Sequence, residues 1–241
     1  MRTAIKYTLA LSAVVLLVAC GGGGGGGEVA PTTPVDYQLR TGYVNYVTST
    51  GSSNFTVSGT YTTGGTSYPI TGSGTTTLGS LSATTFEGLP AQMKAGTVTG
   101  SISVNGTSQS LNGTQYSYVN SNYDPLGNSG TEYVVVTTRN AIPVTARVND
   151  TNIFYTANRY TTSQKTSQLG TRSVSFVIEP YSGSNAYLTI ISTDKNNSGT
   201  TTATNSAKFI MTPAGALTRV NETGVSNSTN PTAVTSLIIN Y

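Results

Sequence analysis

The stretch Val57-Ser-Gly-Thr-Tyr-Thr-Thr-Gly-Gly-Thr-Ser-Tyr-Pro-Ile-Thr-Gly72 recurs as Val98-Thr-Gly-Ser-Ile-Ser-Val-Asn-Gly-Thr-Ser-Gln-Ser-Leu-Asn-Gly113. The centre of each copy, Gly64-Gly65 or Asn105-Gly106, suits the two positive φ angles of a type I′ turn. The flanking residues alternate between apolar and polar types, as in half-buried strands. The sequence therefore predicts the same β-hairpin twice. Two copies are too few for a solenoid, and chance similarity in a Thr/Ser/Gly-rich chain is the alternative.

Short alternating runs continue along the chain and are separated by turn residues. No run has a sustained helical period, and the best helix candidate, Pro90–Ala95, is a single turn. These features predict an all-β fold of antiparallel hairpins or meanders. The pattern leaves open whether they form a β-sandwich or a small β-barrel. The further predicted strands are Tyr43–Val47, Tyr133–Val136, Ile153–Tyr155, Val174–Ile178, Ala186–Ile191, Lys208–Met211 and Ser236–Ile239.

The longest strand-free stretch of the body follows Tyr118 and contains the turn sequence Asp124-Pro125-Leu126-Gly127. We place a boundary here between an N-terminal module, residues 36–125, and a C-terminal module, residues 126–241. The first module holds the repeated hairpin, and the second has about eight candidate strands. A single continuous sandwich across both modules is the alternative.

The first residues have the pattern of a secretory signal peptide. Arg2 and Lys6 precede an apolar run from Tyr7 to Ala19, which ends at Cys20, the one cysteine of the chain. At about 13 residues the run is shorter than the roughly 20 residues that a membrane-spanning helix needs. The sequence therefore predicts a segment, residues 1–19, that is removed after export.

The four residues Leu17-Val18-Ala19-Cys20 resemble the lipobox of bacterial lipoprotein precursors. The resemblance implies cleavage between Ala19 and Cys20 and a diacylglycerol on the thiol of Cys20. It also implies sorting to the outer membrane, because the next residue, Gly21, is not aspartate. The alternative is an ordinary cleaved signal peptide whose cysteine has no such role.

Residues 20–35 are predicted to form a flexible tether, because they contain seven successive glycines and two prolines. A glycine run behind a lipobox cysteine is also similar to the start of Gly-tract surface lipoproteins. That likeness is one of composition. It implies a body held away from the membrane and carries over no binding residues.

The chain contains no histidine, which excludes histidine bases, Ser-His-Asp triads and histidine-ligated zinc. Paired carboxylates are the chemistry that remains. Asp150 and Asp194 are expected at loop tips, and the loop after Asp194 lacks the final glutamate of a calcium loop. Glu87 and Glu179 stand beside predicted strands. All of these acids are isolated in the sequence, so we expect neither an enzyme nor a cofactor.

Without residues 1–19 the chain keeps ten basic and nine acidic side chains, a net charge of +1. No basic run exists, so nucleic acid is not an expected partner. Tyrosines in or beside predicted strands suit either a carbohydrate- or protein-binding surface or half-buried strand positions. These tyrosines are Tyr43, Tyr46, Tyr61, Tyr116, Tyr118, Tyr133, Tyr155, Tyr160 and Tyr187.

The leading hypothesis is a non-enzymatic, lipid-anchored β protein of the bacterial outer membrane. It would face the cell surface or the periplasm and have a structural or partner-binding role of unknown specificity. The second hypothesis is a lipid-tethered membrane β-barrel or pore component, because the final segment alternates Leu237, Ile239 and Tyr241. An acid-pair hydrolase is the weakest hypothesis.

Overall fold

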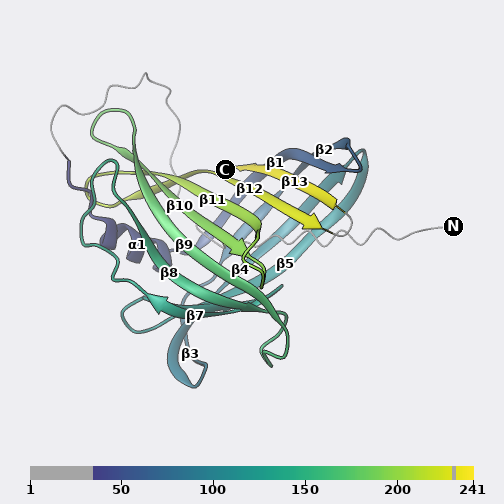
Figure 1. The fold of residues 1–241 in the computed structure, drawn as a ribbon. Coiled ribbons are helices and arrows are strands. Elements are labelled where there is room, and N and C mark those ends of the chain that lie inside the picture. The colour runs from purple at the N-terminus through teal and green to yellow at the C-terminus, as the bar shows by residue number, and fades with distance from the viewer. Residues whose placement is uncertain (1–34, 230–231) are drawn as a thin grey trace.

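The computed structural model describes residues 35–229 and 232–241, which form one antiparallel sheet and one helix. Twelve strands close into a barrel and one further strand extends it, so the all-β prediction is confirmed (Figure 1). The elements are α1 (Leu39–Thr48), β1 (Gly51–Thr63), β2 (Thr66–Leu78), β3 (Ser82–Phe86), β4 (Leu89–Val104), β5 (Thr107–Val119), β6 (Pro125–Ser129), β7 (Tyr133–Arg139), β8 (Thr151–Tyr160), β9 (Gln168–Pro180), β10 (Ala186–Lys195), β11 (Thr201–Met211), β12 (Leu217–Thr229) and β13 (Thr232–Asn240).

The barrel is a meander that closes through two pairings between strands distant in sequence. From β4 to β13, each strand pairs with the next one along the chain. β13 then returns to pair with β1, and β2 pairs with β4, which completes the ring. Of the two predicted architectures, the structure is therefore the barrel. Strands of both predicted modules lie in the same ring.

The repeated sequence forms two neighbouring hairpins, β1–β2 and β4–β5, as predicted. Their turns have positive φ at both central residues, 55° and 79° at Gly64-Gly65 and 50° and 80° at Asn105-Gly106. Because β2 pairs with β4, the two similar hairpins lie side by side in the wall.

Two short elements differ from the prediction. The predicted strand Tyr43–Val47 lies in helix α1, whereas the best helix candidate of the sequence, Pro90–Ala95, lies in β4. Burial explains the helix, because it packs Leu39 and Tyr46 into the end of the barrel. The Tyr46 ring meets Phe209 of β11 edge-on, with ring centroids 5.6 Å apart. This contact joins residues far apart in sequence, so it outweighs the local strand preference of tyrosine and valine.

Inward and outward positions alternate along the strands. In β9, Val174, Phe176 and Ile178 are buried, while Ser175 and Val177 between them are partly exposed. One apolar cluster surrounds α1 and the inner faces of β8–β11, and a second lies between β1, β2 and β4. The barrel is therefore filled by side chains.

No helix in the described residues has the length and hydropathy of a transmembrane helix.

Candidate binding surface

The predicted cleavage and lipidation residues, Ala19 and Cys20, lie outside the described residues, as does most of the predicted tether. Signal cleavage, acylation of Cys20 and the tether therefore stay predictions. The described residues include the acids and the tyrosines that the sequence singled out, together with the polar strand faces.

Asp194 does not lie at a loop tip, contrary to the sequence prediction. It is the last inward residue of β10 and is completely buried. The tip begins after it, where Asn196 Oδ1 accepts hydrogen bonds from the backbone N–H groups of Ser198 and Thr200. β10 continues past the predicted strand Ala186–Ile191 and includes Asp194, because Arg172 on β9 supplies a partner for the buried carboxylate.

Asp194 belongs to a charge network that joins the inner faces of β8–β10 to Glu132, the residue before β7. Arg172 holds it through two hydrogen bonds, Nε to Oδ1 at 2.6 Å and Nη2 to Oδ2 at 2.7 Å. Arg159 Nη2 lies 3.3 Å from the same Oδ2 and also pairs with Glu132. Glu132 lies 3.4 Å from Arg172, which closes the network. Two positive and two negative charges therefore neutralise each other inside the barrel.

The surroundings of Arg172 favour its ionised form. Burial alone would lower the pKa of the Arg172 guanidinium, but its hydrogen bonds to Asp194 and the nearby carboxylate charges raise the pKa. Bidentate arginine–carboxylate pairs of this kind are among the stronger hydrogen-bonded contacts in proteins. This network was not predicted from the sequence. A signal was present, since Arg172 shares its period with Val174, Phe176 and Ile178.

Lys94 of β4 is also buried inside the barrel, where it holds the end of α1. Its ammonium donates to the carbonyl of Val47 at 2.9 Å and, at 3.4 Å, to the carbonyl of Tyr46 and the hydroxyl of Ser49. These carbonyls have no partner within the helix, and the C-terminal end of a helix attracts positive charge. Burial lowers the pKa of Lys94 to about 8. The lysine is therefore part of the packing of the helix.

The other acids considered from the sequence are paired at the surface. Glu179 accepts a hydrogen bond from Thr189 at 2.6 Å and lies 3.2 Å from Lys208. Glu87 accepts a hydrogen bond from Tyr133 at 2.6 Å and pairs with Lys165. Hydrogen bonds lower the pKa of both glutamates, chiefly the one from Thr189 to Glu179 and the one from Lys165 to Glu87. Asp150 lies in a turn, as predicted, and accepts a hydrogen bond from the backbone N–H of Arg147.

The tyrosines do not form an exposed surface. All nine that the sequence singled out are buried or half-buried. Tyr46 and Tyr43 pack at α1, and Tyr118 and Tyr133 lie against Phe86 on the outside of the wall. The seven that lie in strands therefore occupy half-buried strand positions, and Tyr43 and Tyr46 are packed in helix α1.

A continuous polar surface covers the outside of the two similar hairpins, and we call it the hydroxyl face. Four outward positions on each of four adjacent strands carry serine, threonine or asparagine and no charge. Several of these side chains bond across strands, such as Ser52 with Thr77 at 2.8 Å and Thr97 with Thr114 at 3.2 Å. The positions are Ser52, Asn54, Thr56 and Ser58 of β1, Thr71, Ser73, Thr75 and Thr77 of β2, Thr97, Thr99, Ser101 and Ser103 of β4, and Ser108, Ser110, Asn112 and Thr114 of β5.

The hydroxyl face ends at an unpaired strand edge on β5. β4 pairs with one edge of β5 along its whole length, from Thr107 to Val119. On the other edge β6 pairs only with Tyr116–Val119. Among the described residues, no strand pairs with the rest of this edge, and no backbone hydrogen bond outside the strands reaches it. In Figure 1 this part of β5 lies at the free margin of the barrel wall.

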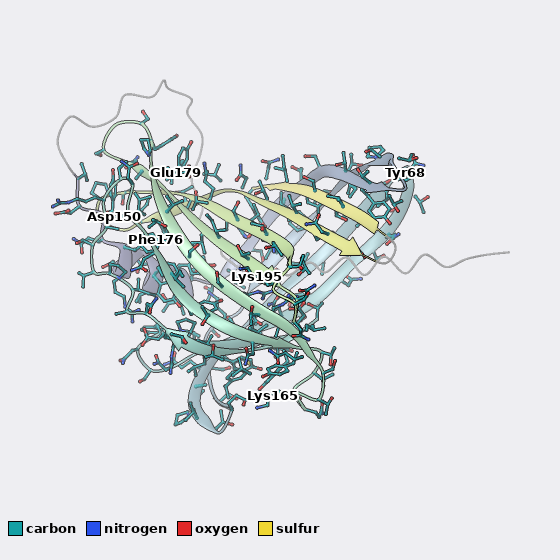
Figure 2. All side chains as sticks on the ribbon, viewed as in Figure 1. Tyr68, Asp150, Lys165, Phe176, Glu179 and Lys195 are labelled. Atoms are coloured by element: carbon teal, nitrogen blue, oxygen red, sulfur yellow. The ribbon has the colours of Figure 1, made fainter. Side chains whose placement is uncertain are left out.

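Side chains lie on both sides of the barrel wall, and the labelled residues show the difference between the interior and the strand ends (Figure 2). Phe176 lies in the interior cluster, whereas Tyr68 and Lys165 lie near the strand ends.

Comparisons with protein-family models, with curated protein sequences and with solved structures find no match to this chain.

Proposed function

We propose that this chain is a lipid-anchored lipoprotein of the bacterial outer membrane with a non-enzymatic, structural or partner-binding role. The observation that carries the proposal is Leu17-Val18-Ala19-Cys20 at the end of a short apolar run. Acyl chains on Cys20 would anchor the protein, since two hydrophobic signals already give stable membrane attachment. Residues 20–35 would then link the anchor to the barrel, with a root-mean-square span of about 20 Å.

The distribution of polar groups supports a barrel that works outside the bilayer. A membrane barrel carries an outward apolar band about 25 Å tall and a polar interior. Here the hydroxyl face covers four adjacent strands, while apolar clusters fill much of the interior. Serine, threonine and asparagine side chains would lose their hydrogen bonds to water in hydrocarbon, which is unfavourable.

The pairing of the acids supports a binding or structural role over hydrolysis. A carboxyl group that acts as the general acid of a glycosidase needs a raised pKa. Asp194 and Glu132 lie against arginines, and the pKa values of Glu87 and Glu179 are lowered. An acid-pair hydrolase therefore stays the weakest alternative.

The second candidate function is a lipid-tethered membrane barrel or pore component. The observation in its favour is the closed ring of antiparallel strands, which is also the architecture of outer-membrane barrels. It requires the barrel wall to lie in the membrane, whereas the proposal requires only the acyl chains to do so. Detergent dependence therefore separates the two.

The proposal is tested by expressing the full chain and its Cys20→Ser variant in a Gram-negative host. We expect the parent chain to incorporate labelled palmitate and to accumulate as a precursor with globomycin, and we expect the variant to do neither. Unlabelled, normally processed parent protein would overturn the lipid anchor. A parent chain without residues 1–20 should dissolve in buffer without detergent, and a need for detergent would favour the membrane barrel. Protease treatment of intact cells then distinguishes the cell surface from the periplasm.

A further inference from the structure

The unpaired part of β5 lacks the features that normally keep a strand edge from pairing with another chain. Natural edges carry lysine, proline, a bulge or an inward charge. From Thr107 to Gly113 the sequence is Thr-Ser-Gln-Ser-Leu-Asn-Gly, with no charge and no proline. Its register with β4 has no bulge. Within residues 35–229 and 232–241, the backbone N–H and C=O groups on this edge are therefore open to a further strand.

The free length of the edge is fixed by its neighbours. At one end the Asn105-Gly106 turn leads back to β4. At the other end Gly130, just after β6, lies against Thr114 and Gln115, since a Cβ on Gly130 would be 3.0 Å from the Thr114 carbonyl oxygen. The open β5 edge, Thr107 to Gly113, is consequently centred on Ser110.

We infer that the open β5 edge pairs antiparallel with the same edge of a second copy of this chain. A two-fold axis through the sheet at Ser110 places this residue opposite its own copy, because an isologous interface uses one patch twice. Ser108 then faces Asn112, and Gln109 faces Leu111. Every pair is uncharged, and each joins side chains on the same side of the sheet.

The space around the edge fits this partner. Thr107 would face Gly113, where an added Cβ would meet no atom within 4 Å, so the threonine has room. The start of each β5, at Thr107, would lie near the end of the partner's β6. The pairing would therefore stop where β6 already covers the edge. The hydroxyl faces of the two copies would join into one uncharged surface across β4 and β5.

The inference goes beyond the proposed function and does not depend on the lipid anchor, because it concerns strands of the folded body. A short edge buries less surface than a standard stable interface, so we expect association that depends on concentration. Two copies held on one membrane would associate more readily than in solution, because anchoring raises their effective concentration.

The test uses charge on the outer face of the edge. In Ser110→Lys the two lysines would lie opposite each other at the two-fold axis, and cross-strand like charges repel. By sedimentation of the full chain in excess detergent, we expect a dimer for the parent. For Ser110→Lys and for Ser110→Glu we expect dimerisation at least about tenfold weaker than for the parent. A mixture of the two variants should form a heterodimer. Ser73→Lys, on the same outer face but at a position of β2 that pairs with both β1 and β4, is the matched control and should dimerise like the parent.

Disulfide trapping in intact cells provides a second measurement at native density. Ser110→Cys should form a covalent dimer under mild oxidation, and Ser73→Cys and the parent should not. A monomeric parent that also gives no trapped Ser110→Cys dimer would overturn the inference, as would an unaffected dimer in Ser110→Lys. Capture of a strand from a different protein would leave the parent monomeric and therefore counts against the inference too. Palmitate labelling of the same proteins reports on the anchor separately.

Discussion

The buried carboxylate of Asp194 provides the sharpest test of how the barrel interior is held together. In Asp194→Asn the side chain keeps its shape but loses its charge. Arg172, which donates to both carboxylate oxygens at 2.6 and 2.7 Å, would then share Glu132 with Arg159 as the one remaining acid of the network. Because Asp194 is completely buried, water cannot replace the lost charge. Removing one partner of a buried ion pair costs about 3–5 kcal/mol, and we expect a loss of this size.

Urea unfolding measures this loss. The chain has fifteen tyrosines and no tryptophan, so tyrosine fluorescence and far-ultraviolet circular dichroism are the suitable signals. The midpoint should fall while the slope stays the same, because the surface exposed on unfolding does not change. Asp150→Asn is the matched control, since Asp150 is exposed, and its change should stay within about 1 kcal/mol.

A double variant separates the loss of a partner from the value of the pair. In Arg172→Met with Asp194→Leu, both charges are replaced by apolar side chains, and such replacements are often neutral or stabilising. We therefore expect the double variant to be more stable than Asp194→Asn. A cost below about 1 kcal/mol for Asp194→Asn would refute the reasoning, because it would mean that the network contributes little to specifying this interior.

Two further predictions concern the interior lysine and a crowded glycine. Because burial lowers the pKa of Lys94 to about 8 from 10.5, the unfolded chain binds more protons between these values, so the stability of the parent should rise with pH in this window by up to about 3 kcal/mol. Lys94→Met should lack this rise in urea unfolding at pH 8 and pH 10, and an identical pH dependence in both proteins would contradict the assignment. Gly127→Ala should cost about 1–3 kcal/mol, because its Cβ would lie 2.6 Å from the Phe86 ring and 2.1 Å from a backbone oxygen. Gly113→Ala, with open space at that position, should leave the urea midpoint nearly unchanged, and equal effects of the two substitutions would show that this crowding is not the cause.

The parts of the fold that depend on residues adjacent in the sequence were predictable from the sequence. Turn residues with positive φ, such as Asn105-Gly106, mark the hairpins directly, and the alternation beside them identifies the strands. The choice between sandwich and barrel was not predictable in this way. It depends on two long-range pairings, β1 with β13 and β2 with β4, and no local pattern encodes either of them.

The same distinction explains the errors at α1 and β10. Tyr43–Val47 has the composition of a strand, but it forms a helix because Tyr46 packs on Phe209 and Lys94 binds the carbonyls at the helix end. Asp194 resembles a loop residue, but it continues β10 because Arg172 lies opposite it on β9. In both places the deciding partner lies on another strand, and its position could be known only after the register of the sheet was known.

The two sides of the wall use polar residues for different purposes, and this bears on the open β5 edge. Several of the few charged side chains of the chain lie inside the barrel, where Arg172, Asp194 and Lys94 fix the register of strands and the end of α1. The hydroxyl face, in contrast, keeps the outer wall polar without charge. Charge is one of the features by which natural strand edges avoid pairing, and the open β5 edge also has no proline and no bulge, so it is available to a strand of matching register. The sequence around Ser110 can pair in matching register with its own copy, and the introduction of charge by Ser110→Lys and Ser110→Glu tests this directly.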